Sequence, residues 1–372
     1  MGGLLHCRPP EGSSPPRMPP PRRPVTPGPD PYPSQRGRGA LLGLAVGDAL
    51  GVPLKARLLP APPFPQLADG PHRALKGGGP FELRRGQVGE NGQMASCLGV
   101  GLRELGTYDA DQQLRRYLAW QGHAAGLSEY MTEVLTEVAE SGLPKATAGR
   151  RVWLKGMRRV AHNGSLARTA PLGVFFHEDT QARVQASLAD SALTHFDPRC
   201  QLACAAFNGS LAHALTAGEP LKKEDLITAA MSGLTVGSAI LGRSAGDYVQ
   251  EVTVATQALK EDLAAAQQED PMLYWPDLHM HRKQDHVRVA FRLAYWEVLH
   301  APSFETGLLD VINRGGDADA NGAVAGALLG AFHGEDAIPS EWRHGVLEAL
   351  GPGSGPLGSL YHPRQLLPLA PE

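Results

Sequence analysis

Apolar residues recur at helical spacing along most of the chain, and no stretch shows the alternation of polar and apolar residues that a half-buried strand requires. The segments with helical spacing are expected to be helices, ended by caps, glycines and prolines. They cover residues 37–51, 93–105, 109–123, 128–140, 145–161, 180–193, 198–217, 222–241, 248–266, 285–300, 303–312 and 319–333. The pattern predicts an all-α fold, a single compact domain of orthogonally packed helices, about fifteen in number.

Residues 313–332 stand apart because they begin with glycines and aspartates and then become almost entirely small and apolar. Gly315 and Gly316 allow backbone turns that a side chain would forbid. The run after them is expected to be a helix buried on nearly all sides, so Asp317 and Asp319 stand near its N-terminal end. A cation held between the two carboxylates would explain them, and helix capping is the alternative. The glycine turn in front of them favours the cation.

Residues 38–51 form a second segment of small residues, the early counterpart of 313–332. Asp48 lies in its last turn, where the helix dipole disfavours a negative charge. Either Asp48 accepts hydrogen bonds from a neighbouring loop, or it faces a binding cleft. Both interpretations stay open, and Asp48 is kept as a candidate substrate-binding residue.

The ends of the chain lack this helical spacing. Residues 1–36 are dense in Pro, Arg, Ser and Gly and are expected to be a disordered tail, because they cannot bury enough apolar surface to offset chain entropy. The helical domain is expected to span residues 37–350, and residues 351–372 to form an irregular C-terminal tail. Within the domain, residues 58–85 are rich in Pro and Gly, and so long a loop is usually functional or mobile.

Composition restricts the function classes further. The 372 residues carry a formal net charge of −3, which gives no bulk attraction to nucleic acid or to a membrane surface. No apolar run has the length of a membrane span, and the N-terminus lacks the apolar core of a signal peptide. The four cysteines have no zinc-site spacing and suggest no disulfide framework. We therefore expect a cytoplasmic protein, a monomer, without nucleic-acid or membrane partners.

Four segments carry motifs that belong together. They are residues 38–51, the Asn-Gly-Ser-x-x-Arg-x-x-Pro pattern at 163–171, residues 192–198, and residues 303–330 followed by 338–342. In this order and spacing they resemble the ADP-ribosylglycohydrolase family, which includes the bacterial hydrolase that reactivates dinitrogenase reductase. The resemblance covers residues 37 to about 350 and implies an all-α fold.

The resemblance also implies a chemistry. Family members typically carry two magnesium ions at the base of a cleft and release ADP-ribose from a modified side chain or small molecule. The bond broken is at an anomeric carbon, so positive charge develops on the sugar ring, and oxygen-ligated cations orient the ribose hydroxyls and activate a water. The expected ligand is accordingly ADP-ribose or an ADP-ribosylated substrate.

The segments that would hold the ligand match the family well. Asn163, Gly164 and Ser165 offer a turn with backbone N–H groups that suits a diphosphate, with an ordinary turn between helices as the alternative. His195 is a candidate for hydrogen bonding to a ribose or phosphate, although a lone His at a helix boundary is more often structural. Arg168 is either a phosphate partner or a member of a buried ion pair. The resemblance adds Gly315 and Gly316 to the substrate-binding candidates.

The segments that would hold metal depart from the family. Its early Thr-Asp-Asp-Thr element aligns with Gly89, Glu90, Asn91 and Gly92, and its late ligating Thr has become Ala320. The metal candidates are therefore Glu90, Asn91, Asp317 and Asp319, with Glu90 and Asp317 as the catalytic candidates. Three carboxylates neutralise two dications poorly, so we expect one Mg²⁺ rather than two.

Lys55 occupies the position of an acidic residue often found after the first helix of family members. If it points into the cleft, its ammonium takes the position of the missing cation, and if not, it simply faces solvent. We predict a hydrolase that cleaves the glycosidic bond of an ADP-ribosylated protein side chain or small molecule. The alternative is a weakened or inactive family member that binds ADP-ribose or has a structural or regulatory role.

Overall fold

The computed structural model describes residues 1, 32–60, 64, 69–140 and 147–372. Within these residues the chain forms fifteen α-helices, short 3₁₀ turns and one ladder of two strands. The helices and strands are α1 (Tyr32–Gly51), β1 (Arg57–Leu58), α2 (Glu90–Leu105), α3 (Ala110–Gln121), α4 (Glu129–Glu140), α5 (Ala148–Lys155), α6 (Gly164–Arg168), α7 (Ala170–Phe175), α8 (Thr180–Thr194), α9 (Pro198–Thr216), α10 (Lys223–Ser244), α11 (Val249–Ala265), α12 (Val287–His300), α13 (Phe304–Asn313), β2 (Gly315–Gly316), α14 (Ala318–His333) and α15 (Ser340–Glu348). The all-α prediction is confirmed.

The two small-residue segments form one antiparallel helix pair, α1 against α14. Glycines spaced four residues apart let their backbones touch: a Cβ at Gly43 would lie 2.0 Å from the carbonyl oxygen of Gly326, and a Cβ at Gly47 would lie 1.9 Å from that of Gly322. No side chain fits between such backbones. This contact joins residues far apart in sequence and fixes where α1 ends relative to where α14 begins.

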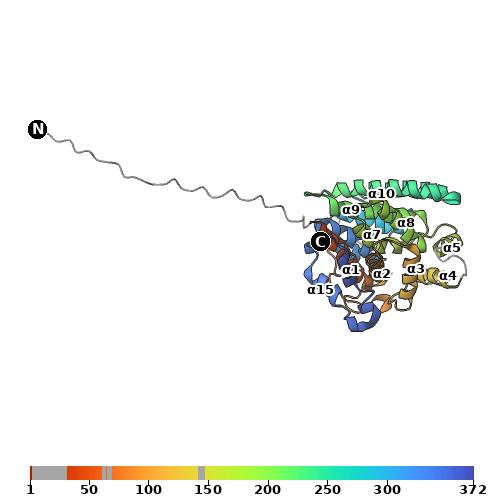
Figure 1. The fold of residues 1–372 in the computed structure, drawn as a ribbon, viewed down its shortest axis with the longest axis horizontal. Helices are drawn as coiled ribbons and strands as arrows, with labels where there is room; N and C mark the ends of the chain where they lie inside the picture. The colour runs from red at the N-terminus through yellow and green to blue at the C-terminus, as the bar shows by residue number, and fades with distance from the viewer. Residues whose placement is uncertain (2–31, 61–63, 65–68, 141–146) are drawn as a thin grey trace. The chain divides into compact units, whose positions relative to one another are not determined.

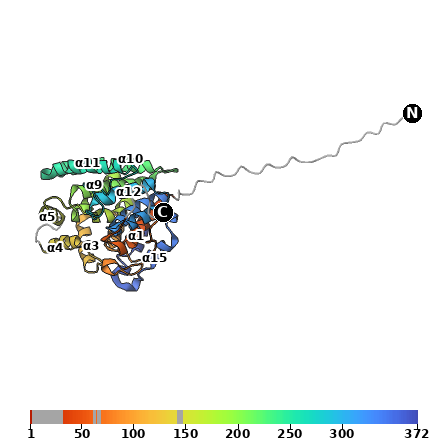
Figure 2. The same ribbon diagram turned by 180° about the vertical axis from the view of Figure 1, so that it is seen from behind.

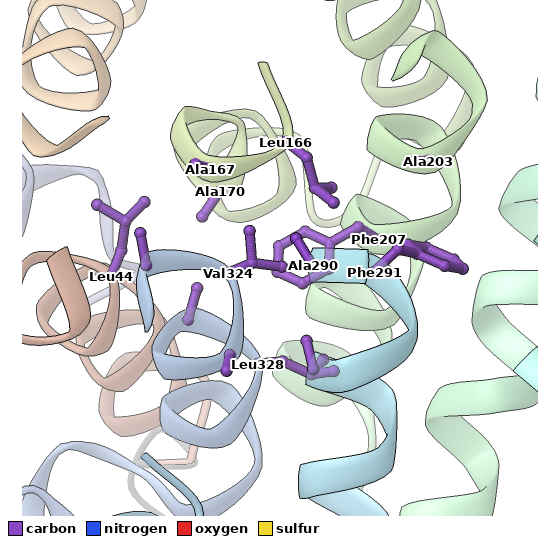
Figure 3. Packing of buried hydrophobic residues seen from close by; sticks show 14 of the residues in the cluster. Leu44, Leu166, Ala167, Ala170, Ala203, Phe207, Ala290, Phe291, Val324 and Leu328 are labelled. Carbon is purple, nitrogen blue, oxygen red and sulfur yellow. The ribbon is translucent and has the colours of Figure 1, made fainter. Parts of the chain in front are cut away.

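Around this pair the other helices form the core. Figure 3 shows Leu44 of α1, Val324 and Leu328 of α14, Leu166 of α6, Phe207 of α9 and Phe291 of α12 converging in one packed region. Helix α9 is buried along nearly its whole length, and α10 and α11 lie side by side at the edge next to it (Figures 1 and 2). A smaller apolar cluster joins α3 and α4 to the end of α8, the start of α5 and α2.

Helix α10 has the length and apolar composition of a membrane-spanning helix, although only 39% of its most apolar window is buried in the fold. Its inner face, which includes Leu226, Leu234 and Leu241, packs against α8, α9 and α11 as a core helix does. Length and composition are therefore weak evidence for a membrane span here.

Most predicted helices appear with ends shifted by a few residues, and three short helices escaped prediction. Helices α6 and α7 are too short to show a period, and α15 begins directly after Pro339. The two-residue ladder between β1 and β2 was also not predicted, because so short a pairing leaves no alternation to recognise.

The domain limits differ from the prediction at both ends. One compact unit spans Pro31–Glu372, and residues 32–36 belong to α1 rather than to a tail. The rest of the predicted disordered tail, residues 2–31, lies outside the described residues. Residues 351–372 are not a separate irregular tail, because Leu366 and Leu369 anchor their 3₁₀ turns in the core.

Candidate active site

One open cavity of about 730 Å³ collects residues from distant parts of the chain. Its walls include Glu90 and Asn91 from the start of α2, Asp317 and Ala320 from the start of α14, and Lys55 from the segment after α1. The described part of the predicted functional loop reaches it too, through Pro80 and Phe81. The metal candidates that lie far apart in sequence therefore do gather at one place.

Lys55 is the centre of this arrangement. Its Nζ donates to Asp317 Oδ1 at 2.7 Å and to Asp319 Oδ1 and Oδ2 at 2.8 and 2.9 Å. Asp317 stands at the N-cap of α14 but accepts no capping hydrogen bond there, so capping does not explain it. The cation that lies between the two aspartates is the ammonium group of Lys55. The alternative that Lys55 faces solvent is wrong.

The electrostatics of this cluster favour the ion pairs of Lys55 with Asp317 and Asp319. Burial alone would lower the pKa of Lys55, but the attraction of Asp317 and Asp319 outweighs it and raises the pKa well above its usual value. Burial also raises the pKa of Asp319 to about 6, even though Lys55 opposes that shift. Lys55 is thus fully protonated at neutral pH and holds both carboxylates at the mouth of α14.

Asp48 is fully buried behind the cavity wall. Its Oδ2 accepts hydrogen bonds from the backbone N–H groups of Gly89 (2.7 Å) and Gly92 (3.0 Å), and its Oδ1 accepts one from Asn91 Nδ2 (3.1 Å). It therefore caps the N-terminus of α2 from a neighbouring helix, because the N-cap residue Gly89 has no side chain to do so. Asp48 does not line the cavity, so its assignment to substrate binding is corrected.

Glu90 lines the cavity, but its carboxylate is held from one side. Oε2 accepts the backbone N–H of Ser128 at 2.6 Å, and Oε1 accepts the Ser128 hydroxyl at 3.2 Å. Burial raises its pKa above the ordinary value, and these hydrogen bonds together with Lys55 partly offset that effect. The loop before α4 thus fixes the orientation of this predicted catalytic group.

The residues present do not fit Mg²⁺ at the position that the family resemblance implies. Lys55 Nζ stands between Asp317 and Asp319, and the other nearby acids, Asp48 and Glu90, already accept hydrogen bonds from the protein. A Cβ at position 92 would lie 2.9 Å from Asp48 Oδ2, so the threonine of the family pattern has no room there. In the part of the chain that the structure describes, no group of three or more His, Cys, Asp or Glu residues is arranged to hold a metal ion.

The ligand-holding candidates divide into two sets. Asn163, Gly164 and His195 line the cavity, whereas Ser165 is fully buried and its Oγ lies 2.9 Å from Ser191 Oγ. A Cβ at Gly164 would lie 3.0 Å from His195 Nε2, so the glycine lets the imidazole approach the backbone of the turn. The assignment of Ser165 to direct substrate contact is corrected, because its hydroxyl points into the core network.

His195 is an uncharged hydrogen-bonding group in this wall. Burial, together with the positive charges of Arg168 and His162, holds its pKa well below the usual value. Its Nδ1 lies 2.8 Å from Thr194 Oγ1, which orients the ring. Arg168 itself pairs with Asp190 at 3.0 Å and is fully buried, so of its two interpretations the buried ion pair is the correct one.

Gly315 and Gly316 shape the backbone of the site rather than contact a ligand. Both have positive φ, +69° and +68°, which favours glycine. They pair with Arg57 and Leu58 in the short ladder, and this pairing brings the segment that carries Lys55 to the mouth of α14. Neither lines the cavity, so their assignment to substrate binding is also corrected.

Sequence reasoning missed an aromatic wall in the same cavity. The ring of Tyr130 lies 4.5 Å from that of His162 and 4.9 Å from that of His195, and its hydroxyl donates to the carbonyl oxygen of Thr194 at 2.7 Å. His162 in turn binds Asp285 at 2.6 Å through Nδ1. The only signal for Tyr130 in the sequence is its place at the start of an amphipathic helix, which indicates nothing about a ligand.

Comparison with known proteins agrees with this geometry. The ADP-ribosylglycohydrolase family model matches residues 29–365, which is most of the chain. The chain belongs to the ADP-ribosylglycohydrolase family. A solved structure titled ADP-ribosylglycohydrolase-related protein complex superimposes with a TM-score of 0.64 at 27% identity, covering 91% of this chain and 98% of that one.

Two relatives of this chain are bacterial and carry the names of ADP-ribosyl hydrolases. ADP-ribosylarginine hydrolase Tri1 of Pseudomonas putida (strain GB-1) is 27% identical over 82% of this chain and 73% of the relative. ADP-ribosyl-[dinitrogen reductase] glycohydrolase of Rhodospirillum rubrum is 27% identical over 82% of this chain and 88% of the relative. The family and these relatives support an ADP-ribosyl glycohydrolase and do not favour the inactive alternative.

Proposed function

We propose that the chain releases ADP-ribose from an ADP-ribosylated protein side chain, with ADP-ribosylarginine as the first substrate to test. Two relatives support this choice, since one is named for ADP-ribosylarginine and the other for a modified protein, dinitrogen reductase. The chain departs from the family pattern at the metal-binding segments. We propose that the Lys55 ammonium takes the place of the expected Mg²⁺.

The observation that carries the proposal is the convergence of two kinds of groups on one cavity. Glu90 and Asp317 supply carboxylates to the cavity. The turn at Asn163 and Gly164 supplies backbone groups to the same cavity, which Tyr130 also lines. A volume of about 730 Å³ lies within the range of small-molecule sites. Carboxylates beside an anomeric carbon stabilise the positive charge that develops on the ribose as the glycosidic bond breaks.

Each group has a definite part in this proposal. As water attacks the anomeric carbon, the C–N bond to the arginine guanidinium breaks and the guanidine leaves with the bonding electrons. Asp317, held by Lys55, accepts the proton of the water, while Asp319 keeps Lys55 in place. Glu90, whose pKa is raised by burial, faces the ribose from the α2 side. Lys55 supplies positive charge beside Asp317 and Asp319 without a metal ion, and the neutral His195 ring offers a hydrogen bond to a hydroxyl or phosphate oxygen.

The test is release of ADP-ribose from a peptide mono-ADP-ribosylated on arginine, followed by chromatography with the full chain. We expect release that persists in excess chelator and falls strongly in Asp317→Asn and Glu90→Gln. Binding of free ADP-ribose, measured by calorimetry, should persist in both variants. Binding without release from arginine-, serine- or cysteine-linked peptides would overturn the hydrolase in favour of the binding-only alternative.

We also propose a cytoplasmic location. The described cysteines Cys97, Cys200 and Cys204 are buried and unpaired, as in proteins of reducing compartments. The predicted monomer stays a prediction that a sedimentation measurement would test.

A further inference from the structure

A second cavity, of about 830 Å³, lies directly beside the active cleft. The two cavities share Val160, His162 and Asp285 in their walls. The hydrogen-bonded pair of His162 and Asp285, 2.6 Å apart, therefore stands between them. The loop that leads from α5 to α6 and the segment before α12 contribute most of the charged lining, and α11 contributes the opposite wall.

The lining of this second cavity is rich in cationic side chains in a chain whose formal net charge is −3. The cations are Arg158, Arg159, Arg199, Arg282 and Lys283, and the carboxylates are Asp197, Glu251 and Asp285. Every carboxylate already has a partner: Asp197 binds Arg199 at 2.8 Å, Glu251 binds Arg158 at 2.6 Å, and Asp285 binds His162. The local excess of positive charge is thus not cancelled inside the cavity.

Three of the cations carry this excess. Arg159, Arg282 and Lys283 are exposed, and none of them forms an ion pair with a carboxylate among the described residues. Lys283 only donates to the backbone carbonyl of Asp277, at 3.0 Å. Arg159 lies in the loop after α5, whereas Arg282 and Lys283 lie just before α12, so the three charges approach the cavity from two separate segments. An anionic ligand is what such a lining attracts.

The other wall indicates what kind of anion fits. Val254 of α11 is 57% exposed, and Val160 adds further aliphatic surface. Among the residues that the structure describes, none in this lining is a Phe, Tyr or Trp on which a nucleic-acid base could stack. Aliphatic surface beside guanidinium and ammonium groups suits a peptide that carries both carboxylates and apolar side chains.

We propose that this second cavity binds an acidic segment of the ADP-ribosylated substrate protein, next to the modified side chain. The proposal rests on the proposed function, because the modified residue must reach the active cleft while its flanking segment lies in the second cavity. The shared wall makes this geometry simple, since the peptide passes His162 on its way from one cavity to the other. Arg159, Arg282 and Lys283 are then specificity residues rather than catalytic ones.

The test compares two arginine-ADP-ribosylated peptides that differ only in flanking residues, one with three Asp or Glu residues and one with Gln or Asn in their place. Binding is measured by fluorescence polarisation at low salt. We expect the acidic peptide to bind about tenfold more tightly, since a few exposed charge pairs add up to that factor. The advantage should shrink as salt screens it.

Two charge-reversed proteins locate the effect. R159E/R282E/K283E should abolish the preference for the acidic peptide while leaving the Kd for free ADP-ribose unchanged. The control R243E/K260E reverses two exposed cations of α10 and α11 that line neither cavity, and it should keep the preference. A preference that survives R159E/R282E/K283E, or that both proteins lose equally, would overturn the proposal.

The outcomes also separate this inference from the proposed function. If free ADP-ribose fails to bind to the wild-type protein, the proposed function fails. If ADP-ribose binds but the acidic flank brings no advantage, only the second-cavity proposal fails. An oligonucleotide of matched charge is included as competitor, and competition by the oligonucleotide without any effect of the acidic flank would assign the cavity to nucleic acid instead.

Discussion

The α1–α14 helix pair has a body, where the two helices pack along their length, and a rim, where α1 ends and α14 begins. Different interactions hold these two regions together. In the body, Gly43 and Gly47 meet Gly326 and Gly322 backbone to backbone, with no room for a Cβ. At the rim, the backbones still touch at Gly51, but charged side chains also pair there, as Lys55 does with Asp317 and Asp319. The glycines of the body leave no room for a side chain, whereas the side chains of the rim are held by paired charges.

This difference explains how a chain keeps the family fold while its metal motifs change. The fold depends on the glycine contacts, which exclude larger residues by steric repulsion. The rim needs positive charge beside Asp317 and Asp319, and either a metal ion or an ammonium supplies it. A lysine already tethered to the chain costs less entropy than a separate ion must lose on binding. The same rim therefore tolerates the loss of the family threonines.

The largest expected effect comes from placing a methyl group in the body. Gly43→Ala should destabilise the fold by about 4 kcal/mol or more, because the new Cβ meets a backbone carbonyl that cannot move alone. The matched control is Gly242→Ala in α10, where a new Cβ meets nothing within 4 Å. There, alanine should raise stability by up to about 1 kcal/mol through helix propensity. Urea denaturation measures the stability of both variants, and equal effects of the two substitutions would contradict the close backbone packing.

The rim should respond to loss of Lys55. Lys55→Ala leaves two buried carboxylates without their cation and should cost about 3 kcal/mol in the presence of chelator. The wild-type melting temperature should not respond to millimolar Mg²⁺, but that of the variant should rise with it, because Asp317 and Asp319 become available as oxygen ligands.

Arg57→Ala is the control for Lys55→Ala, because Arg57 is exposed and lies two residues further along the same segment. It should leave both the stability and the absence of a Mg²⁺ response unchanged. A wild-type protein that Mg²⁺ stabilises as strongly as the Lys55→Ala variant would show that the lysine does not replace the metal.

The helices could be predicted from the sequence better than the side-chain contacts of the site. The helices, and the small-residue character of both 38–51 and 313–332, follow from composition and helical spacing, whereas the packing of these two segments against each other was not predicted. The position of Lys55 was one of two open alternatives, since a lysine side chain is long enough to face either the cleft or the solvent. Asp48 was equally open, and its capping role depends on Gly89 and Gly92 lying opposite it, a contact that no local pattern encodes. Tyr130 and the second cavity depend on loops whose folded course the sequence does not reveal.

The smallest expected effect is a difference in the pH dependence of stability between the wild-type protein and Asp48→Asn. It distinguishes titration of Asp48 from titration of the rim ion pair. Burial first, and the charge of Asp319 second, raise the pKa of Asp48 to about 7. The folded state therefore holds a proton on Asp48 that the unfolded state has already released, so its contribution to stability is complete below the ordinary aspartate pKa and is lost as pH rises through 7. Between about pH 6 and pH 8 this amounts to a loss of roughly 1 kcal/mol. Asp48→Asn keeps an acceptor for the α2 amides but cannot titrate, so its stability should fall less over this range. Parallel pH slopes for the two proteins in urea denaturation would place the raised pKa elsewhere in the cluster.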